Sequence, residues 1–416
     1  MNSDVLARGA WAVHRGHALH WRVRHARADA EYPRDHSSQS AHGGLYLLPR
    51  ARREGATFSS HRLPLVYVSD ESTSPGRSPF LSPGESERQA SMRRPADPIA
   101  FELFKNAVFS IADEMALTVV RTTYSGVIKS VMDFSTAFAD ADGKMVAQGL
   151  TLPGHLGSIP TALDTVMRMF DGNIRDGDVF VLNDPFAGGM HLPDIFVFKP
   201  IFYEGERLAF AATVCHHTDM GGRVAGSNAS DSTEIFQEGL RIPPLKLYDA
   251  GRRNDTLFAL IERNVRVPVS VIGDIRAQLA ACHTGETQFL ELVRRTGVAQ
   301  SRALMQEVID YAERLTRNAI AQLPDGEWSF EDWIDDDGID RGRRIRLFVT
   351  FTKRGDHIIA DWAGSSPQVK GAINATLSFT KAATYTAVRS VLPGDIPNNE
   401  GVFRTIEVHA PPGTVC

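Results

Sequence analysis

The first sustained pattern of hydrophobic and polar positions begins at Asp97 and predicts a helix. In DPIAFELFKNAVFSIADEMALTVVR, apolar residues return every three or four positions from Phe104 to Val119, the spacing of one helix face. Asp97 is a favoured N-cap residue, and Pro98 suits the first helical position. The sequence therefore predicts a helix that begins just after Asp97 and buries one side.

Further along the chain, the pattern alternates between strand-like and helix-like stretches. Hairpins are predicted for TAFADADGKMVAQ (136–148) and RIRLFVTFTKRGDHIIADWAG (344–364), each with a turn sequence at its centre. Helical spacing predicts a short helix opened by Ser158 and Pro160 and ending near Gly172, two helices over about 273–322, and a helix in TKAATYTAVRSVL (380–392). These stretches predict an α+β fold of hairpins and sheets with packed helices.

Residues 1–91 do not share this patterning. They are rich in arginine and histidine, lack lysine, and end in SDESTSPGRSPFLSPGESERQAS, a composition that cannot build a core. A transit peptide would share the arginines, but acidic residues argue against one, namely Asp4, Asp29, Glu31 and Asp35. We interpret 1–91 as a disordered leader, with Met92 as the natural start of the protein.

A turn signal divides the patterned part of the chain. PDGEW (324–328) combines proline and glycine between a helical and a strand-like stretch, which predicts a turn and a subdomain boundary. We therefore expect one region over 92–323 and a second α/β subdomain over 324–416.

Composition narrows the class of protein. The chain has 416 residues, 43% of them hydrophobic, with a net charge of -5 and a pI near 6.3, which argues against nucleic acid or an anionic membrane as the main partner. No apolar run approaches the roughly 18 residues of a membrane span. The few scattered cysteines, Cys215, Cys282 and Cys416, fit a reducing compartment, so we expect a cytoplasmic protein.

Two short stretches combine histidine with aspartate: NDPFAGGMHLPD (183–194) and CHHTDMGG (215–222). Between them, IFVFKPIFY and RLAFAATVC are strand-like and EGE is a turn signal, which predicts a hairpin. A turn centred on Gly205 places Asp194 opposite His216 at the open end, with Cα atoms about 5 Å apart. His191 precedes Asp194 by three residues, so the three side chains are expected to converge.

Two imidazoles and a carboxylate suit Zn²⁺, Mn²⁺ or Fe²⁺, and open coordination positions are typical of a catalytic metal. Pairs of glycines beside both stretches allow close backbone approach, namely Gly188, Gly189, Gly221 and Gly222. The same residues also have an ordinary interpretation, because a histidine at a strand end is usually exposed or hydrogen-bonded and an aspartate there often caps a turn. The residues alone leave the two interpretations evenly balanced.

Several blocks of the sequence resemble one known family. NDPFAGGMHLPD, CHHTDMGGRVAGS, EIFQEGLRIPPLKL and GDIRAQLAA are similar to signature blocks of the hydantoinase B family, and MDFSTAFADADGKMVAQ, LPGHLGSIP and DWAGSSPQVKGAINA resemble further blocks in the same order. The resemblance runs from about Asp97 to the C-terminus and leaves 1–91 without a counterpart. It implies a hydantoinase B-like fold. Because family members continue beyond PPGTVC, we expect the chain to be truncated at its C-terminus.

The resemblance implies a set of metal ligands. In members with a metal in this subunit, the ligands are the His-x-x-Asp pair, the first His of a His-His pair and the Asp of a D-F-S block. The matching residues here are His191, Asp194, His216 and Asp133. Asp133 is assigned by resemblance alone, and the residues SVM before it depart from the charged version of many members, which leaves substrate choice open.

Three further residues are candidates for catalytic work. His217 and Asp219 would orient the ligands or transfer protons, although a hydrogen-bonded structural role for His217 is an equal alternative. His155, in PGHLGS, is a candidate residue of the substrate pocket, with a structural role as the somewhat favoured alternative.

The resemblance also implies an ATP-dependent complex. The family includes B-type subunits of N-methylhydantoinases, the corresponding half of 5-oxoprolinase, and subunits of acetone and acetophenone carboxylases. The sequence has no Walker A motif or Gly-rich dinucleotide fingerprint, so ATP is implied to bind a hydantoinase A-type ATPase partner. We expect a metal-dependent B-type subunit that opens a cyclic amide after activation by that partner. The alternatives are a carboxylase subunit and a non-catalytic scaffold for the A-type partner.

Overall fold

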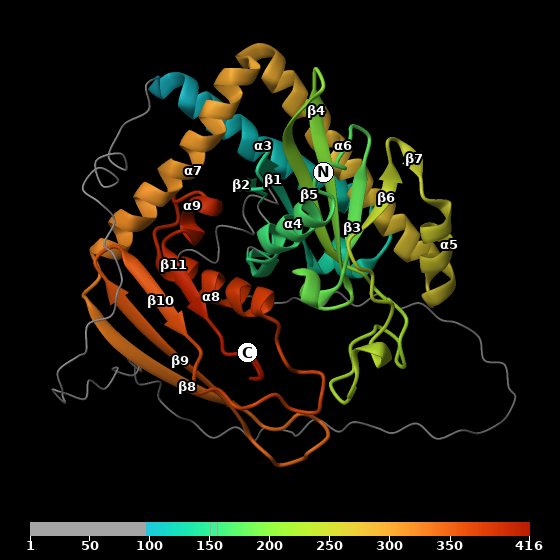
Figure 1. The fold of residues 1–416 in the computed structure, drawn as a ribbon, viewed down its shortest axis with the longest axis vertical. Helices are drawn as coiled ribbons and strands as arrows, with labels where there is room; N and C mark the ends of the chain where they lie inside the picture. Colours follow the sequence, from blue (N-terminus) through green and yellow to red (C-terminus); the bar gives the residue numbers. More distant parts are fainter. Residues whose placement is uncertain (1–96, 150, 156) are drawn as a thin grey trace, which may run out of the picture. The chain divides into compact units, whose positions relative to one another are not determined.

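The computed structural model describes residues 97–149, 151–155 and 157–416 (Figure 1). The disorder expected of residues 1–91 and the start at Met92 lie outside the described residues. The described chain combines helices with two β-sheets, which confirms the predicted α+β class. None of its helices is both long enough and apolar enough to cross a membrane.

The helix predicted after Asp97 is α3, Pro98–Thr122. It begins there because Asp97 Oδ1 accepts hydrogen bonds from the backbone N–H groups of Ile99 and Ala100, each at 3.0 Å. Every residue of the predicted apolar stripe is buried, namely Phe104, Val108, Ile111, Met115 and Val119. This face packs against α6, Pro268–Thr296, and against the main sheet.

The main sheet has seven strands in the order β2-β1-β5-β4-β3-β6-β7, and every neighbouring pair is antiparallel. Its strands are β1 Phe134–Asp140, β2 Met145–Gln148, β3 Val179–Leu182, β4 Asp194–Tyr203, β5 Glu206–His216, β6 Leu245–Asp249 and β7 Arg252–Arg253. The pairing of β1 with β2 confirms the first predicted hairpin. Because β5 has a neighbour on each side, its end is fixed by two ladders.

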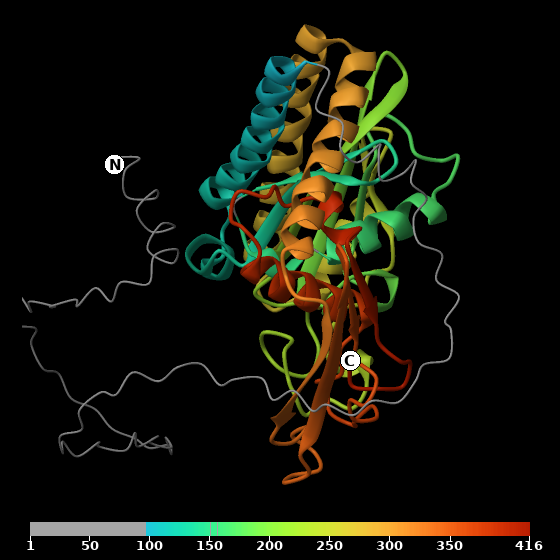
Figure 2. The same ribbon diagram turned by 90° about the vertical axis from the view of Figure 1, so that its left-hand side faces the viewer.

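Both faces of this sheet are covered, so alternate residues of a strand enter different cores. In β3, Val181 belongs to the core beneath α3 and α6, whereas Phe180 and Leu182 belong to the core beneath α4. Helices α3, α6 and α7 lie side by side over the first face (Figures 1 and 2). The second core also includes Ile358 and Ile406 of the smaller sheet.

The smaller sheet has four strands in the order β11-β10-β9-β8, namely β8 Gly326–Ile334, β9 Ile345–Arg354, β10 His357–Asp361 and β11 Ile406–His409. Strands β9 and β10 confirm the second predicted hairpin. The turn predicted over 324–328 is wrong in its second half, because β8 begins at Gly326 and pairs with β9 along its whole length. This edge strand is largely exposed, so it lacks the alternation that reveals a half-buried strand.

The remaining α-helices are α4 Ser158–Met169, α5 Asp255–Asn264, α7 Val298–Ala321, α8 Leu377–Val391 and α9 Glu400–Phe403. The start predicted at Ser158 and the pair of helices predicted over 273–322 are confirmed, although α6 begins earlier, at Pro268. Proline at the first helical position explains this earlier start. Short π- and 3-10 turns complete the described chain, namely η1 Val127–Val131, η2 Pro153–His155, η3 Pro185–Ala187 and η4 Ile235–Gln237.

Candidate metal centre

The hairpin of β4 and β5 brings the two histidine–aspartate stretches together. Asp194 pairs with His216 in the antiparallel ladder, which confirms the register predicted from the turn at Gly205. Glu204 and Gly205 both have positive φ, 52° and 85°, as expected for a tight two-residue turn. The first residue of β4 and the last of β5 therefore stand side by side at the open end.

Three side chains converge at this end of the hairpin. His191 Nδ1 lies 2.8 Å from Asp194 Oδ2, and His216 Nδ1 lies 3.3 Å from Asp194 Oδ1. One ligand atom from each residue lies within 4.8 Å of those of the other two. The structure thus brings together the three residues that the sequence pattern grouped, and we call His191, Asp194 and His216 the triad.

Asp133 joins the triad from a different part of the chain. It lies just before β1, which pairs with β5 on the side away from β4. The backbone N–H of His216 donates to Asp133 O at 3.0 Å, and Asp133 Oδ2 lies 3.8 Å from His216 Nδ1. Three neighbouring strand ends therefore supply the residues that the family resemblance grouped as ligands.

His155 lies near the carboxylates of both Asp133 and Asp194. Its buried ring has Nε2 at 3.9 Å from Asp133 Oδ1 and at 4.0 Å from Asp194 Oδ2. Its Nδ1 lies 2.9 Å from the hydroxyl of Ser135, a residue that the sequence analysis did not single out. Ser135 lies two residues after Asp133 in an apolar strand. Its contact with His155 depends on the packing of the 3-10 turn η2 on β1, which the local sequence does not indicate.

Burial and charge set the protonation of these groups. Burial raises the pKa of Asp194, but the hydrogen bond and positive charge of His191 outweigh burial and hold it well below its usual range. Burial lowers the pKa of His191, but the hydrogen bond to Asp194 and the negative charges of Asp194, Asp133 and Glu238 together outweigh burial, so the net shift is upward. Burial lowers the pKa of His155 despite the nearby carboxylates, which keeps its ring uncharged near neutral pH.

The structure does not bring His217 and Asp219 to the triad. The ring of His217 is buried on the side of α6, where Nε2 lies 3.0 Å from Gln278 Oε1. Asp219 accepts hydrogen bonds from Arg266 and from the backbone N–H of Gly221. Roles in fixing the strand end and the following loop fit these two residues better than proton transfer to a substrate.

The charges around the triad fit a divalent cation. Asp194 Oδ1 is buried and has no hydrogen-bond partner among the described residues, because His216 Nδ1 lies near it without hydrogen-bond geometry. Such an orphaned carboxylate oxygen is costly unless a positive group satisfies it. Asp133 adds a second carboxylate, and the imidazoles add nitrogen donors. This mixed set suits Zn²⁺, Mn²⁺ or Fe²⁺.

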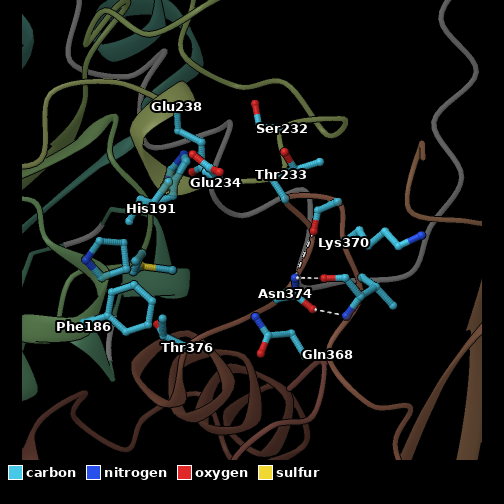
Figure 3. Close-up of a pocket in the computed structure, with 16 residues that line it drawn as sticks. Phe186, His191, Ser232, Thr233, Glu234, Glu238, Gln368, Lys370, Asn374 and Thr376 are labelled. Atoms are coloured by element: carbon cyan, nitrogen blue, oxygen red, sulfur yellow. Dashed lines mark hydrogen bonds between the residues drawn. The ribbon is translucent and has the colours of Figure 1, made fainter. Parts of the chain in front are cut away.

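Two cavities meet at His191 and its neighbour Met190. The first, of about 400 Å³, is polar and lies between the loops 232–238 and 368–376; Figure 3 shows His191 and Glu238 on one side of it and Asn374 on the other. The second, of about 530 Å³, is lined on one side by His191 and Asp194 together with Asp133 and His155, and on the other by α8. Both volumes lie in the usual range for small-molecule pockets.

The fold and this site define the class of protein. Residues 97–416 match the sequence model of the family described as hydantoinase B/oxoprolinase, so the chain belongs to the hydantoinase B/oxoprolinase family. This confirms the resemblance on which the ligand set rests. The match begins at the N-cap of α3 and covers the described chain.

Particular relatives are named as subunits of a caprolactamase and of a hydantoinase. The chain is 35% identical to the beta subunit of the caprolactamase of Pseudomonas jessenii and 32% identical to the putative B subunit of a D-/L-hydantoinase from a Pseudomonas species; each alignment covers 77% of this chain, and 55% and 57% of those proteins. The chain thus spans a little over half the length of these curated relatives.

Solved structures agree with this assignment. The crystal structure of the ATP-dependent caprolactamase from Pseudomonas jessenii aligns with a TM-score of 0.73 at 34% identity, over 78% of this chain and 56% of that one. A nucleotide-free acetone carboxylase structure also gives a TM-score of 0.73, at 20% identity, over 80% of this chain and 47% of that chain. The second likeness establishes a shared fold only.

Proposed function

We propose that this chain is the metal-dependent B-type subunit of an ATP-dependent cyclic amide hydrolase. The observation that carries the proposal is the convergence of His191 and His216 on the buried, partly unsatisfied carboxylate of Asp194. The relatives named for caprolactam and hydantoin hydrolysis support the choice of cyclic amides as substrates.

In this proposal, His191, Asp194, His216 and Asp133 hold one divalent cation. When bound, such an ion supplies polarisation of a carbonyl oxygen and a lowered pKa of coordinated water. The chain's own residues then hold and move protons. The uncharged ring of His155 presents Nε2 to the carboxylate side of the site, where it can accept a proton as water adds to the amide carbonyl.

We further propose that ATP is used by a partner. Unstrained amides are poor electrophiles, and no phosphate-binding motif occurs in this sequence. The relatives named as B and beta subunits support assembly with another kind of subunit. We infer a hydantoinase A-type ATPase as that partner, a hetero-oligomer as the working form, and the cytoplasm as its location, since all three cysteines are unpaired.

The test is reconstitution. The chain is expected to show no ATPase activity alone and, with an A-type ATPase partner and a divalent metal, to open lactam or hydantoin rings only when ATP is present. Removal of the site metal by a chelator selective for transition metals, with Mg²⁺ kept in excess, should abolish ring opening while leaving the partner's own ATP binding intact. Turnover that depends on bicarbonate and forms a new C–C bond would establish the carboxylase alternative instead. A chain that stabilises the A-type partner yet binds no metal would establish the scaffold alternative.

A further inference from the structure

The two cavities at His191 differ in how much of the candidate metal centre they reach, and His216 lines neither of them. The cavity against α8 is lined by His191 together with Asp133, His155 and Asp194, whereas the polar cavity of Figure 3 touches His191 alone among these residues. A reacting carbonyl must lie beside the ligand side chains, so the body of the substrate belongs in the α8 cavity, which we call the ring cavity.

The wall of the ring cavity opposite the site is one apolar helix face. Phe379, Ala383 and Ala387 of α8 recur at intervals of four residues, so they lie above one another along the helix. Leu152, 40% exposed, and Phe379, 45% exposed, present apolar surface that the described chain does not cover. This arrangement fits a ligand whose far side is made of methylene groups.

The α8 wall offers no free hydrogen-bond donor to such a ligand. Thr386 is its polar member on α8, and its hydroxyl already lies 2.8 Å from Ala382 O and 3.1 Å from Pro153 O. Polar contacts within the ring cavity are therefore concentrated at its other end, where Asp133, His155 and Asp194 lie. A few convergent polar groups against an apolar wall fix the orientation of a ligand.

Charge in the ring cavity disfavours an anionic ligand. Among the described residues that line it, none is lysine or arginine, while Asp133 and Asp194 are carboxylates. These two carboxylates would balance the charge of a bound divalent cation. A carboxylate carried on the substrate ring would thus lose its hydration against α8 without gaining a cationic partner.

We propose that the ring cavity binds an uncharged cyclic amide, with its apolar ring against Phe379 and Ala383 and its amide toward the triad, and discriminates against a ring that carries a carboxylate. The proposal rests on the proposed function for the reaction, but it concerns ligand selection and can be tested by binding alone.

The binding test uses the full chain with Zn²⁺ present and without ATP or a partner. Ligand-observed NMR titration compares 2-pyrrolidone with 5-oxoproline, which differ only by the ring carboxylate, and adds a seven-membered lactam. The neutral lactams are expected to bind, and 5-oxoproline is expected to bind about 100-fold more weakly, the size of a penalty of roughly 3 kcal/mol for an unpaired charge. Equal or tighter binding of 5-oxoproline, or no binding of either lactam, would overturn the proposal.

Variants locate the binding. Ala383 is exposed on α8, so Ala383→Trp fills the ring cavity without burying a new group in the core and should weaken lactam binding about tenfold or more. Leu377→Trp, on the same helix but outside the cavity lining, is the matched control and should bind like wild type. Ala383→Arg supplies the missing cation and should narrow or reverse the preference against 5-oxoproline. An unchanged preference in Ala383→Arg, or equal losses in both Trp variants, would place the ligand elsewhere.

The two proposals fail in different ways. If lactams bind as expected but the reconstituted complex opens no ring, the proposed function is wrong and the ligand selection stands. If the complex opens rings but prefers 5-oxoproline over its uncharged counterpart, the ligand selection is wrong and the proposed function stands.

Discussion

Ser135 fixes the tautomer of His155. The Ser135 hydroxyl lies 2.7 Å from Leu152 O, a carbonyl that can only accept, so its single hydrogen is used there. At 2.9 Å from His155 Nδ1, the same oxygen must then accept the ring N–H. The electron pair of His155 Nε2 consequently points toward the two carboxylates of the site.

This relationship yields a prediction for Ser135→Ala. Without the Ser135 oxygen as acceptor, the ring of His155 can also carry its proton on Nε2. Ring opening by the reconstituted complex should therefore fall about 10- to 100-fold, while metal content stays near that of wild type. The pH profile should shift as well, which a purely structural loss would not produce. Ser158→Ala is the control, because the Ser158 hydroxyl contacts only the backbone carbonyl of His155. A similar fall and shift in both variants would contradict the tautomer argument.

The side chains of His216 and His217 should differ in their effect on metal content. His216 lies in the triad, whereas the ring of His217 lies against Gln278. His216→Ala should lower metal occupancy about tenfold or more, and His217→Ala should lower it less. Elemental analysis of the purified variants measures both, with exposed His283→Ala as the control. Full occupancy in His216→Ala would remove this residue from the ligand set.

Gly188→Ala should disturb the loop that carries His191. Gly188 has φ of 100°, and a Cβ there would lie 2.6 Å from the backbone nitrogen of Ala162 in α4. We expect a loss of about 1–3 kcal/mol in the free energy of unfolding, and weaker metal binding. Gly172→Ala is the matched control, since it also has positive φ, 69°, but open space around it. Denaturant unfolding should show a clearly smaller loss for Gly172→Ala; equal losses would mean that backbone strain, not the contact with α4, is responsible.

Asp337 should make stability depend on pH in the acid range. Four backbone N–H groups donate to its carboxylate, from Asp340, Ile339, Lys370 and Gly371. These bonds, with that of Asp340 the strongest, lower its pKa from 3.8 to about 2. Because the pKa of Asp337 is lower in the folded than in the unfolded protein, its ionised carboxylate stabilises the fold at pH values above the unfolded-state pKa. This stabilisation is lost as the pH falls through the folded-state pKa. It should therefore be complete above about pH 5 and fade toward pH 2.

The measurement is a comparison of thermal melts of wild type and Asp337→Asn. The gap in Tm should be largest above about pH 5 and close toward pH 2, because protonation of the wild-type carboxylate mimics the amide. Asp325→Asn is a useful comparison, because its carboxylate is held chiefly by the side chain of Lys353 and by one backbone N–H group, that of Gly355. A pH-independent gap for Asp337→Asn would show that the carboxylate charge is irrelevant there.

Local sequence signals were enough to predict the hairpin and its register. Strand-like stretches on either side of Gly205 predict partners whose numbers sum to 410, give or take one, and the observed pair of Asp194 and His216 has this sum. The helix after Asp97 follows equally from its cap and its stripe. These features depend on residues close in sequence, so periodicity and turn chemistry determine them.

Features that depend on distant contacts were not accessible in this way. Asp133 reaches the triad because β1 pairs with the far side of β5, and His155 does so because a 3-10 turn packs on β1. Periodicity does not reveal which strands become neighbours, and the family resemblance alone supplied Asp133. Strand β8 escaped prediction because exposed residues on both of its faces carry no period-2 signal.

The position of β5 between β1 and β4 means that the candidate metal centre is ordered before an ion binds. The backbone N–H of His216 donates to Asp133 O, and that of His217 donates to Pro193 O. The backbone that bears the proposed ligands is therefore held in place by main-chain hydrogen bonds. An ion arriving here would find its donors already arranged, and little of its binding energy would go into ordering the chain. The protein should accordingly remain folded when stripped of metal, and its amides at the hairpin mouth should resist hydrogen exchange equally well in the empty and the loaded forms.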